Sequence, residues 1–430
     1  MAIPYYTSAT LIEAVQRRAS VPINQSTFSN DDFLALANEE IQTLVLPLIM
    51  NMHEDYYSHT EIVPIISNQS RYPVPPRAVG QELRDAFYLD NGGNIRELTR
   101  LEEDDRAYYQ NGGSNNYVGF YFEGNDVVMS PPIQQGATGS LMLVYFFRPN
   151  QLVEQTRTGT IASTDYVSRI ITSITTGTTP TITTTIPTNF SVGDWVRLNQ
   201  TQSIPNIDGL YQVASVISTT QFTVSVNASL SVTVAATAAN SGYATPGKVF
   251  LTGPVPANLI QDSLVDFIAG ANGNSTKDYN RVILTVNSGN NELQFDPKYL
   301  PMTAHQANTV FGNLYVAYND QDSGQFNQVI SSIISYVPLL PGDFVNSAQE
   351  ASVVQIPTDM QPILAQAVVC RLLEAMGDTQ GLANANQKLE QIKSAMQSML
   401  GNRILGAPKK INSRRTLIRY SRITFRRGAR

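Results

Sequence analysis

The change of hydrophobic period along this chain constrains its fold more than any other feature. Near the N-terminus, and again beyond residue 357, apolar residues recur three or four positions apart, which is typical of helices that bury one face. Between about residues 60 and 340, short apolar runs alternate with turn-forming residues, which is typical of strands. We therefore predict an α+β fold, with a helical bundle formed by the N- and C-terminal segments and a β-rich central domain between them.

The N-terminal helices carry start signals. Thr7 or Ser8 can cap a first helix, and Ser29 with Asp32 three residues later resembles a capping box for the second. Pro47 is expected to kink or end this second helix, because proline has no amide hydrogen. The apolar stripe of the second helix consists of Phe33, Ala37, Ile41, Leu44, Val45 and Leu48.

The first β-rich stretch contains short candidate strands. Glu61–Ile66 and Arg71–Val74 are expected to pair with each other, and Phe87–Asp90 with Ile95–Leu98 across an Asn-Gly-Gly turn. Thr99 precedes a run of acidic residues, which predicts the start of a helix. A β-meander is predicted next, over Tyr117–Phe122, Asp126–Ser130 and Leu141–Arg148.

Residues 156–247 form a candidate small all-β insertion. Thr occupies 13 of the 32 positions from 156 to 187, which disfavours a helix there. Trp195, the single Trp, is expected in the core of this module, although with Tyr211 it could also form a sugar-binding platform. Residues 248–340 are a second β-rich region with the candidate strands Arg281–Val286, Glu292–Phe295, Gly312–Tyr318 and Val329–Val337.

The chain returns to helix after residue 357. Thr358 is expected to cap a helix that ends at Gly377, and Gly401 to end the helix that follows. We predict that the two form an αα-hairpin packed on the N-terminal helix over Phe33–Ile49. The second helix carries a narrow apolar seam with the spacing of a and d positions, made of Leu382, Ala385, Leu389, Ile392, Met396 and Met399.

The last thirty residues differ in charge from the rest of the chain. Residues 401–430 contain ten basic and no acidic residues, whereas the other 400 carry 19 basic and 35 acidic residues, a net charge of −16. Such a segment could grip nucleic-acid phosphates, but its interleaved apolar residues favour an extended arm that binds a protein partner. The candidate binding residues are Arg414, Arg415, Leu417, Ile418, Arg419, Tyr420, Arg422, Ile423, Phe425, Arg426 and Arg427.

No residue pattern points to catalysis, a cofactor or a metal. The chain has one cysteine, Cys370, in an apolar run, and three histidines without ligand spacing. The acidic runs Glu102–Asp105 and Asp320–Asp322 are interpreted as a helix start and a turn in preference to cation sites. Neither a secretory signal nor an apolar run of membrane-spanning length is expected. We expect a protein that is not an enzyme.

Four segments of the chain stand out when its features are taken in order. They are Tyr121-Phe-Glu-Gly-Asn-Asp-Val-Val-Met-Ser-Pro-Pro, Gly139-Ser-Leu-Met-Leu-Val-Tyr-Phe-Phe-Arg-Pro, Ile356-Pro-Thr-Asp and Cys370-Arg-Leu-Leu-Glu-Ala-Met-Gly-Asp. With these segments, the order of features resembles the head-to-tail adaptor (connector) proteins of tailed bacteriophages, especially short-tailed ones. The resemblance covers roughly residues 1–155 and 340–430.

The resemblance implies a structural protein of the virion neck or tail, which is in the host cytoplasm during assembly. Its subunits would form a ring, typically a dodecamer, under the portal protein. The ring would extend the DNA channel, through which double-stranded DNA passes without specific binding, and offer a docking platform to tail nozzle or fibre proteins. No membrane is involved. The expected domains are an adaptor core of residues 1–155 plus 341–400, the 156–247 module, the 248–340 region and the 401–430 arm.

Other functions are compatible with the sequence. The chain could be a different tail or neck component, such as a fibre-attachment or baseplate protein, with the insertion as its main functional part. It could also bind DNA through its tail, with a steep salt dependence. A glycan hydrolase would need a pair of carboxylates, and no such pair can be named.

Overall fold

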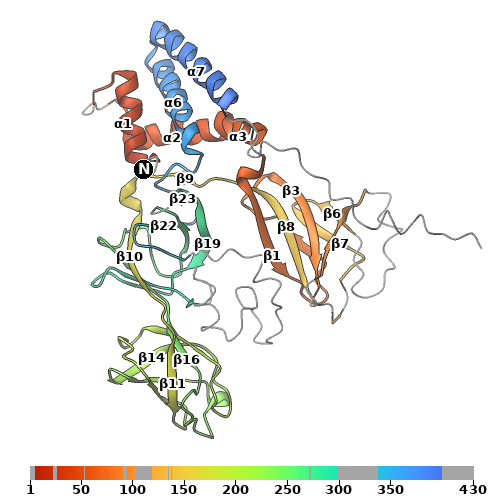
Figure 1. Cartoon of the computed structure of the whole chain (residues 1–430), viewed down its shortest axis with the longest axis vertical. Coiled ribbons are helices and arrows are strands. Elements are labelled where there is room, and N and C mark those ends of the chain that lie inside the picture. Colours follow the sequence, from red (N-terminus) through yellow and green to blue (C-terminus); the bar gives the residue numbers. More distant parts are fainter. Residues whose placement is uncertain are drawn as a thin grey trace, which may run out of the picture.

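The computed structural model describes residues 5–22, 27–52, 54–90, 94–102, 119–133, 135–136, 138–270, 273–297 and 338–399. The chain is mixed α and β with mostly β content (Figure 1). Helices occupy one end, two β-rich parts lie below them, and a small barrel lies at the far end. The predicted strands Gly312–Tyr318 and Val329–Val337 and the 401–430 arm lie outside the described residues.

Helices come from both ends of the chain. Thr7 and Ser29 cap the first two through complete capping boxes, as predicted, and Gly377 ends α6 in a left-handed conformation. The bounds are α1 (Ser8–Ala19), α2 (Asn30–Glu40), the π-helix η1 (Ile41–Val45), α3 (Leu46–Met52), the 3₁₀ turn η6 (Thr358–Met360), α6 (Gln361–Met376) and α7 (Thr379–Met399).

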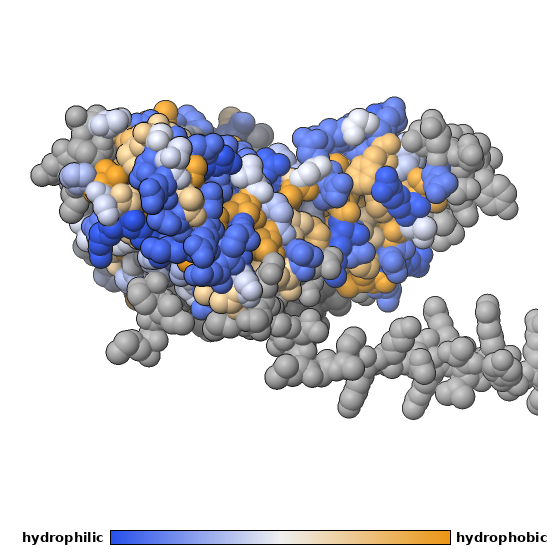
Figure 2. Space-filling view, turned by 90° about the horizontal axis from the view of Figure 1, so that it is seen from above, coloured by the Kyte–Doolittle hydropathy of each residue, from blue (hydrophilic) through white to orange (hydrophobic). Residues whose placement is uncertain are grey.

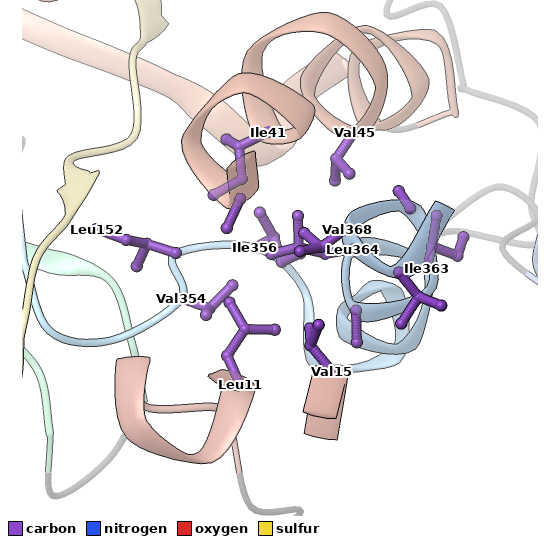
Figure 3. Close-up of a cluster of buried hydrophobic side chains, with 14 of the residues drawn as sticks. Leu11, Val15, Ile41, Val45, Leu152, Val354, Ile356, Ile363, Leu364 and Val368 are labelled. Carbon is purple, nitrogen blue, oxygen red and sulfur yellow. The ribbon is translucent and has the colours of Figure 1, made fainter. Parts of the chain in front are cut away.

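Side chains from both chain ends share one buried hydrophobic cluster (Figure 3). Leu11 and Val15 of α1, Ile41 of η1, and Ile363 and Leu364 of α6 all belong to it. Eleven of the sixteen residues of α6 are buried, so this helix is covered on most sides by its neighbours.

The helical stretch Asn30–Met52 does not end at Pro47. Five residues of π-helix precede α3, and the Leu46 amide donates to the Ile41 carbonyl five residues back. This widened turn lets the chain carry Pro47, which cannot donate a helical hydrogen bond, into the next turn. The stretch is long and apolar enough to cross a membrane, but half of its most apolar window is buried inside the molecule. Packing in the core therefore accounts for its composition.

Two four-stranded sheets face each other below α3, in the orders β1-β8-β3-β4 and β2-β7-β6-β5. Tyr72, Met129, Leu143 and Tyr145 are buried in the cluster between them. The bounds are β1 (Ser58–Pro64), β2 (Arg71–Pro73), β3 (Ala78–Leu89), β4 (Ile95–Glu97), β5 (Thr99–Arg100), β6 (Gly119–Glu123), β7 (Asp126–Ser130) and β8 (Ser140–Phe147).

Several predicted pairings in this part are wrong. β1 pairs with β8 and β2 with β7, so the expected hairpin does not form, because each strand contributes to a different sheet of the sandwich. β6 and β7 form the expected hairpin, but β8 leaves that sheet. The predicted pairing of Phe87–Asp90 with Ile95–Leu98 is confirmed by β3 and β4. Thr99 begins strand β5 and not a helix, because its backbone pairs with Gly119 of β6.

A seven-stranded sheet and a closed six-stranded barrel occupy the rest of the described chain. The sheet order is β19-β18-β22-β10-β17-β21-β20, and the barrel order is β11-β12-β15-β14-β13-β16. The sheet strands are β10 (Gly159–Asp165), β17 (Lys248–Leu251), β18 (Leu264–Ile268), β19 (Thr276–Val282), β20 (Thr285–Asn287), β21 (Glu292–Gln294) and β22 (Phe344–Ser347). The barrel strands are β11 (Arg169–Ile174), β12 (Thr181–Thr184), β13 (Trp195–Asn199), β14 (Gly209–Ser218), β15 (Gln221–Val224) and β16 (Tyr243–Pro246).

The barrel interrupts a hairpin of the seven-stranded sheet. β10 and β17 pair directly, with Asp165 opposite Lys248, and the whole barrel lies between these two residues. The strand predicted over Arg281–Val286 is broken, because Ile283 turns into the core between β19 and β20. A short parallel pair, β9 (Gln151–Leu152) with β23 (Glu350–Ala351), connects this part to the helices.

Thr358 does not cap α6. It begins the 3₁₀ turn η6, and the residue at the N-terminal boundary of α6 is Met360, without a side-chain cap. Met360 is fully buried, which places the helix start inside the shared cluster.

Candidate assembly surfaces and joints

The predicted seam of α7 faces the helical core. Ala385 and Leu389 are buried, at 5% and 7% exposure, and Leu382, Ile392 and Met396 pack partly buried against the same cluster. Met399 is the last residue of α7, and its side chain lies outside the described positions. Of the predicted seam, two side chains are thus buried and three form a half-buried margin.

The opposite flank of α7 is open to solvent. A shallow depression of about 820 Å³ runs along it, lined by Gln387, Glu390, Gln391, Ser394 and Ala395 of this one helix. Seen from the helical end, hydrophobic residues gather at the waist between the two masses of the molecule and are interrupted by hydrophilic ones (Figure 2). These features provide contact surface but no enclosed site.

The predicted arm residues are outside the described part of the chain. All eleven, from Arg414 to Arg427, fall within residues 401–430. Their role stays a prediction.

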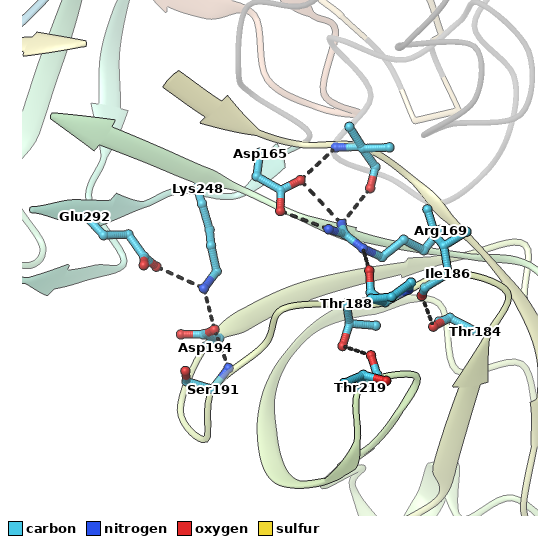
Figure 4. A network of polar contacts seen from close by, with 12 residues as sticks. Asp165, Arg169, Thr184, Ile186, Thr188, Ser191, Asp194, Thr219, Lys248 and Glu292 are labelled. Atoms are coloured by element: carbon cyan, nitrogen blue, oxygen red, sulfur yellow. Dashed lines mark hydrogen bonds and ion pairs between the residues drawn. The ribbon is translucent and has the colours of Figure 1, made fainter. Parts of the chain in front are cut away.

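A buried ion network joins the barrel to the seven-stranded sheet (Figure 4). Lys248 Nζ lies 2.6 Å from Asp194 Oδ2 and 3.2 Å from Glu292 Oε1, and the three side chains are only 6%, 7% and 3% exposed. Gln294 donates from Nε2 to Asp194 Oδ1 at 2.6 Å. Because removing one partner from such a network leaves an uncompensated buried charge, the network fixes the barrel on the sheet.

Three further contacts strengthen this joint. Arg197 of β13 donates to both carboxylate oxygens of Asp296, each at 2.7 Å, in a bidentate pair. Arg169 pairs with Asp165 at 2.9 Å where the chain enters the barrel. Trp195 also lies here, and its Nε1 donates to Thr285 Oγ1 at 3.2 Å across the joint. The expectation that Trp195 fills the barrel core is wrong, because the side chain bridges barrel and sheet and is only partly buried.

A second joint links the seven-stranded sheet to the β-sandwich. Arg77 Nη1 donates to Asp266 Oδ2 at 2.9 Å, and both side chains are almost fully buried. The Asp266 carboxylate also accepts from the side chain of Asn150 and from the backbone amides of Asn280 and Gln349, at 2.9 to 3.0 Å. These donors come from distant segments, so one carboxylate ties several parts of the chain together.

Aromatic and titratable side chains surround this second joint. The rings of His59 and Tyr279 lie 5.5 Å apart, and Tyr145 donates to Glu61 Oε2 at 3.1 Å. Burial, together with the positive charge of Arg77, lowers the pKa of His59 to about 4. Burial raises the pKa of the Glu61 carboxyl, against the opposing effect of its hydrogen bonds from Tyr145 and Tyr279.

The described residues offer no assembled metal-binding group. They contain no cluster of three or more His, Cys, Asp or Glu side chains suited to hold a metal ion. Cys370 is buried, and burial with the negative charge of Glu40 raises the pKa of its thiol. His53 and His305, the acids from Glu103 to Asp105 and the Asp320–Asp322 run lie outside the described positions.

The sequence did not indicate the two joints. Arg77 and Asp266 are 189 residues apart, and Lys248 and Asp194 are 54 apart. Each is an ordinary charged residue in a strand or turn pattern. Only the low exposure of both partners distinguishes them, and exposure is a property of the folded chain.

Part of the chain matches the model of a known protein family. The model of the SU10 adaptor protein family matches residues 6–175, which is less than half of the chain. No curated protein matches the sequence. The family match supports a phage adaptor-type protein, a structural class and not a class of enzymes. It implies a component of the virion neck that contacts other head and tail components.

Proposed function

We propose that this chain is the subunit of a head-to-tail adaptor ring of a short-tailed phage. The ring binds under the portal, extends the DNA channel and presents a docking platform to tail nozzle or fibre proteins. The match of residues 6–175 to the SU10 adaptor protein family carries this proposal. The ring is proposed to be a dodecamer, assembled in the host cytoplasm and retained in the virion.

The charge distribution supports a conduit. The 400 residues before the arm carry a net charge of −16. An acidic wall repels the DNA backbone and keeps a translocating duplex from binding. Specific DNA binding by this part of the chain is therefore not proposed.

The shared core supports a compact adaptor body. α1, α2 and α6 bury side chains in one cluster, although 305 residues lie between Met52, the end of α3, and Thr358, the start of η6. The α6–α7 pair projects from this body beyond the other helices (Figure 1). We propose that α7 leads directly into the arm, and that the arm attaches the body to the portal.

Arm function can be tested by separating its charges from its apolar residues. In one full-length variant, the apolar positions Leu417, Ile418, Tyr420, Ile423 and Phe425 are changed to Ser. In the matched variant, the six arginines among the candidate arm residues are changed to Gln. Portal rings from the same phage are mixed with each variant, and complexes are separated by gradient sedimentation. We expect the apolar-to-Ser variant to lose portal attachment.

Other outcomes would support one of the alternative functions. If only the Arg-to-Gln variant loses portal attachment, and the wild-type chain binds duplex DNA with a steep salt dependence, the arm binds nucleic acid. If the wild-type protein does not bind portal rings but binds tail or fibre proteins, the chain is a fibre-attachment or similar tail component.

A further inference from the structure

The barrel has no free charge. Four charged residues occur between Arg169 and Pro246, and each is engaged inside the molecule. Arg169 pairs with Asp165, Asp194 with Lys248 and Arg197 with Asp296, and Asp208 accepts from the Thr201 amide at 2.8 Å. The net charge of −16 before the arm therefore lies wholly outside the barrel.

Exposed aliphatic side chains are concentrated on the same module. Of the fourteen large hydrophobic side chains that are exposed among the described residues, eight lie between Val167 and Val234. Four of these form what we call the apolar collar, at one end of the barrel. Its members are Ile170, Ile186, Val216 and Ile217, which are 37%, 46%, 38% and 57% exposed.

Backbone hydrogen bonds hold the collar residues near one another. The Thr185 amide donates to the Ile170 carbonyl at 3.0 Å, which places Ile186 beside β11. The amides of Thr184 and Thr188 donate to the carbonyls of Thr220 and Thr219, in the turn that follows β14. Ile186 therefore lies beside the end of β14, where Val216 and Ile217 are found, and Figure 4 shows it next to Thr184 and Thr188.

The chemical character of the collar determines which kind of partner can bind it. Without a free charge, it has no group to bind a phosphate or to attract a surface of opposite sign. It contains no aromatic ring on which a sugar or base could stack. The barrel is closed, so it offers no free strand edge for β-augmentation. What remains is apolar side-chain packing against another protein surface.

We propose that the apolar collar is a contact between two copies of this chain. Identical copies bring identical acidic surfaces together, and like charges facing each other are destabilising. The barrel carries two basic and two acidic residues, all engaged within the molecule, so two copies can meet there without that penalty. The joint through Lys248, Arg197 and Arg169 also fixes the barrel, so each copy presents its collar in the same orientation at little entropic cost.

Charge substitutions on the full-length chain test the contact. Ile186→Lys with Ile217→Lys places charges in the collar. The matched control is Ile204→Lys with Val234→Lys, which changes a pair of 59% and 52% exposed aliphatic residues elsewhere on the barrel. Analytical ultracentrifugation over a concentration series gives the self-association constant. We expect the collar variant to weaken self-association at least tenfold, and the control to match the wild type.

A cross-linking experiment provides a second readout that needs no charge. Because Cys370 is buried, the wild-type chain has no accessible thiol among its described residues, and an introduced cysteine can be cross-linked selectively. With a short bismaleimide, Ile217→Cys should give covalent dimers and Ile204→Cys should not. Absence of wild-type self-association, equal weakening by both Lys pairs, or equal cross-linking at both positions would overturn the proposal. This test uses no portal rings, so a chain that does not bind the portal can still support or contradict the proposed contact.

Discussion

The joint between barrel and sheet makes a quantitative prediction. Lys248→Met keeps the length of the side chain but removes its charge. Asp194 and Glu292, both less than 10% exposed, would then face each other without a cation. Breaking a buried pair in this way costs about 3–5 kcal/mol of unfolding free energy. An exposed control is Arg17→Met, which removes a pair with Glu13 whose side chains are 74% and 53% exposed and should cost at most about 1 kcal/mol.

The assay uses the natural fluorophore of the joint. Trp195 is the single Trp and donates to Thr285 across the barrel–sheet boundary, so its fluorescence in a urea titration follows the opening of this joint. The triple variant Lys248→Met, Asp194→Asn, Glu292→Gln should recover most of the loss, because no unpaired charge stays buried. Equal stability of Lys248→Met and Arg17→Met would refute the argument, since the network would then contribute nothing.

Three other predictions follow from the fold. Leu389→Asp puts a carboxylate in the seam and should lower the unfolding free energy by about 3–5 kcal/mol, seen as a lower Tm than that of the exposed control Gln387→Asp; an unchanged Tm would show that the seam is not buried. His59 has a lowered folded-state pKa of about 4, so between pH 6.5 and 4 the unfolded chain takes up a proton that the folded chain does not, and stability should fall with falling pH by about 3 kcal/mol. His59→Phe should flatten that part of the pH profile, and an unaltered profile would contradict the assignment. Replacing residues 166–247 by Asn-Gly should leave a soluble protein with unchanged helix content by circular dichroism, because Asp165 and Lys248 already pair; an insoluble product would show that the sheet needs the barrel.

Local signals made the helical ends predictable. Thr7 and Ser29 begin helices as expected because a cap acts within three residues of itself. The left-handed Gly377 ends α6 for the same local reason. The prediction that Thr358 caps α6 was wrong, because burial of Met360 in the core, a tertiary effect, decides where α6 begins.

Strand partners were less predictable than strand positions. β1 and β2 are close in sequence, yet each pairs with a strand more than fifty residues away, because the sandwich needs two facing sheets. A period of two in the sequence shows which residues alternate faces, but it does not name the partner strand. The joints at Asp266 and Lys248 lay beyond sequence reasoning for the same reason, since charges distant along the chain become partners only through the fold.

Electron microscopy of the full-length chain, alone and mixed with portal rings from the same phage, can decide whether this chain is a head-to-tail adaptor. We predict a closed ring of this chain beneath the portal, with residues 401–430 ordered along it. If the chain does not bind portal rings and instead binds fibre or baseplate proteins, the adaptor assignment is contradicted.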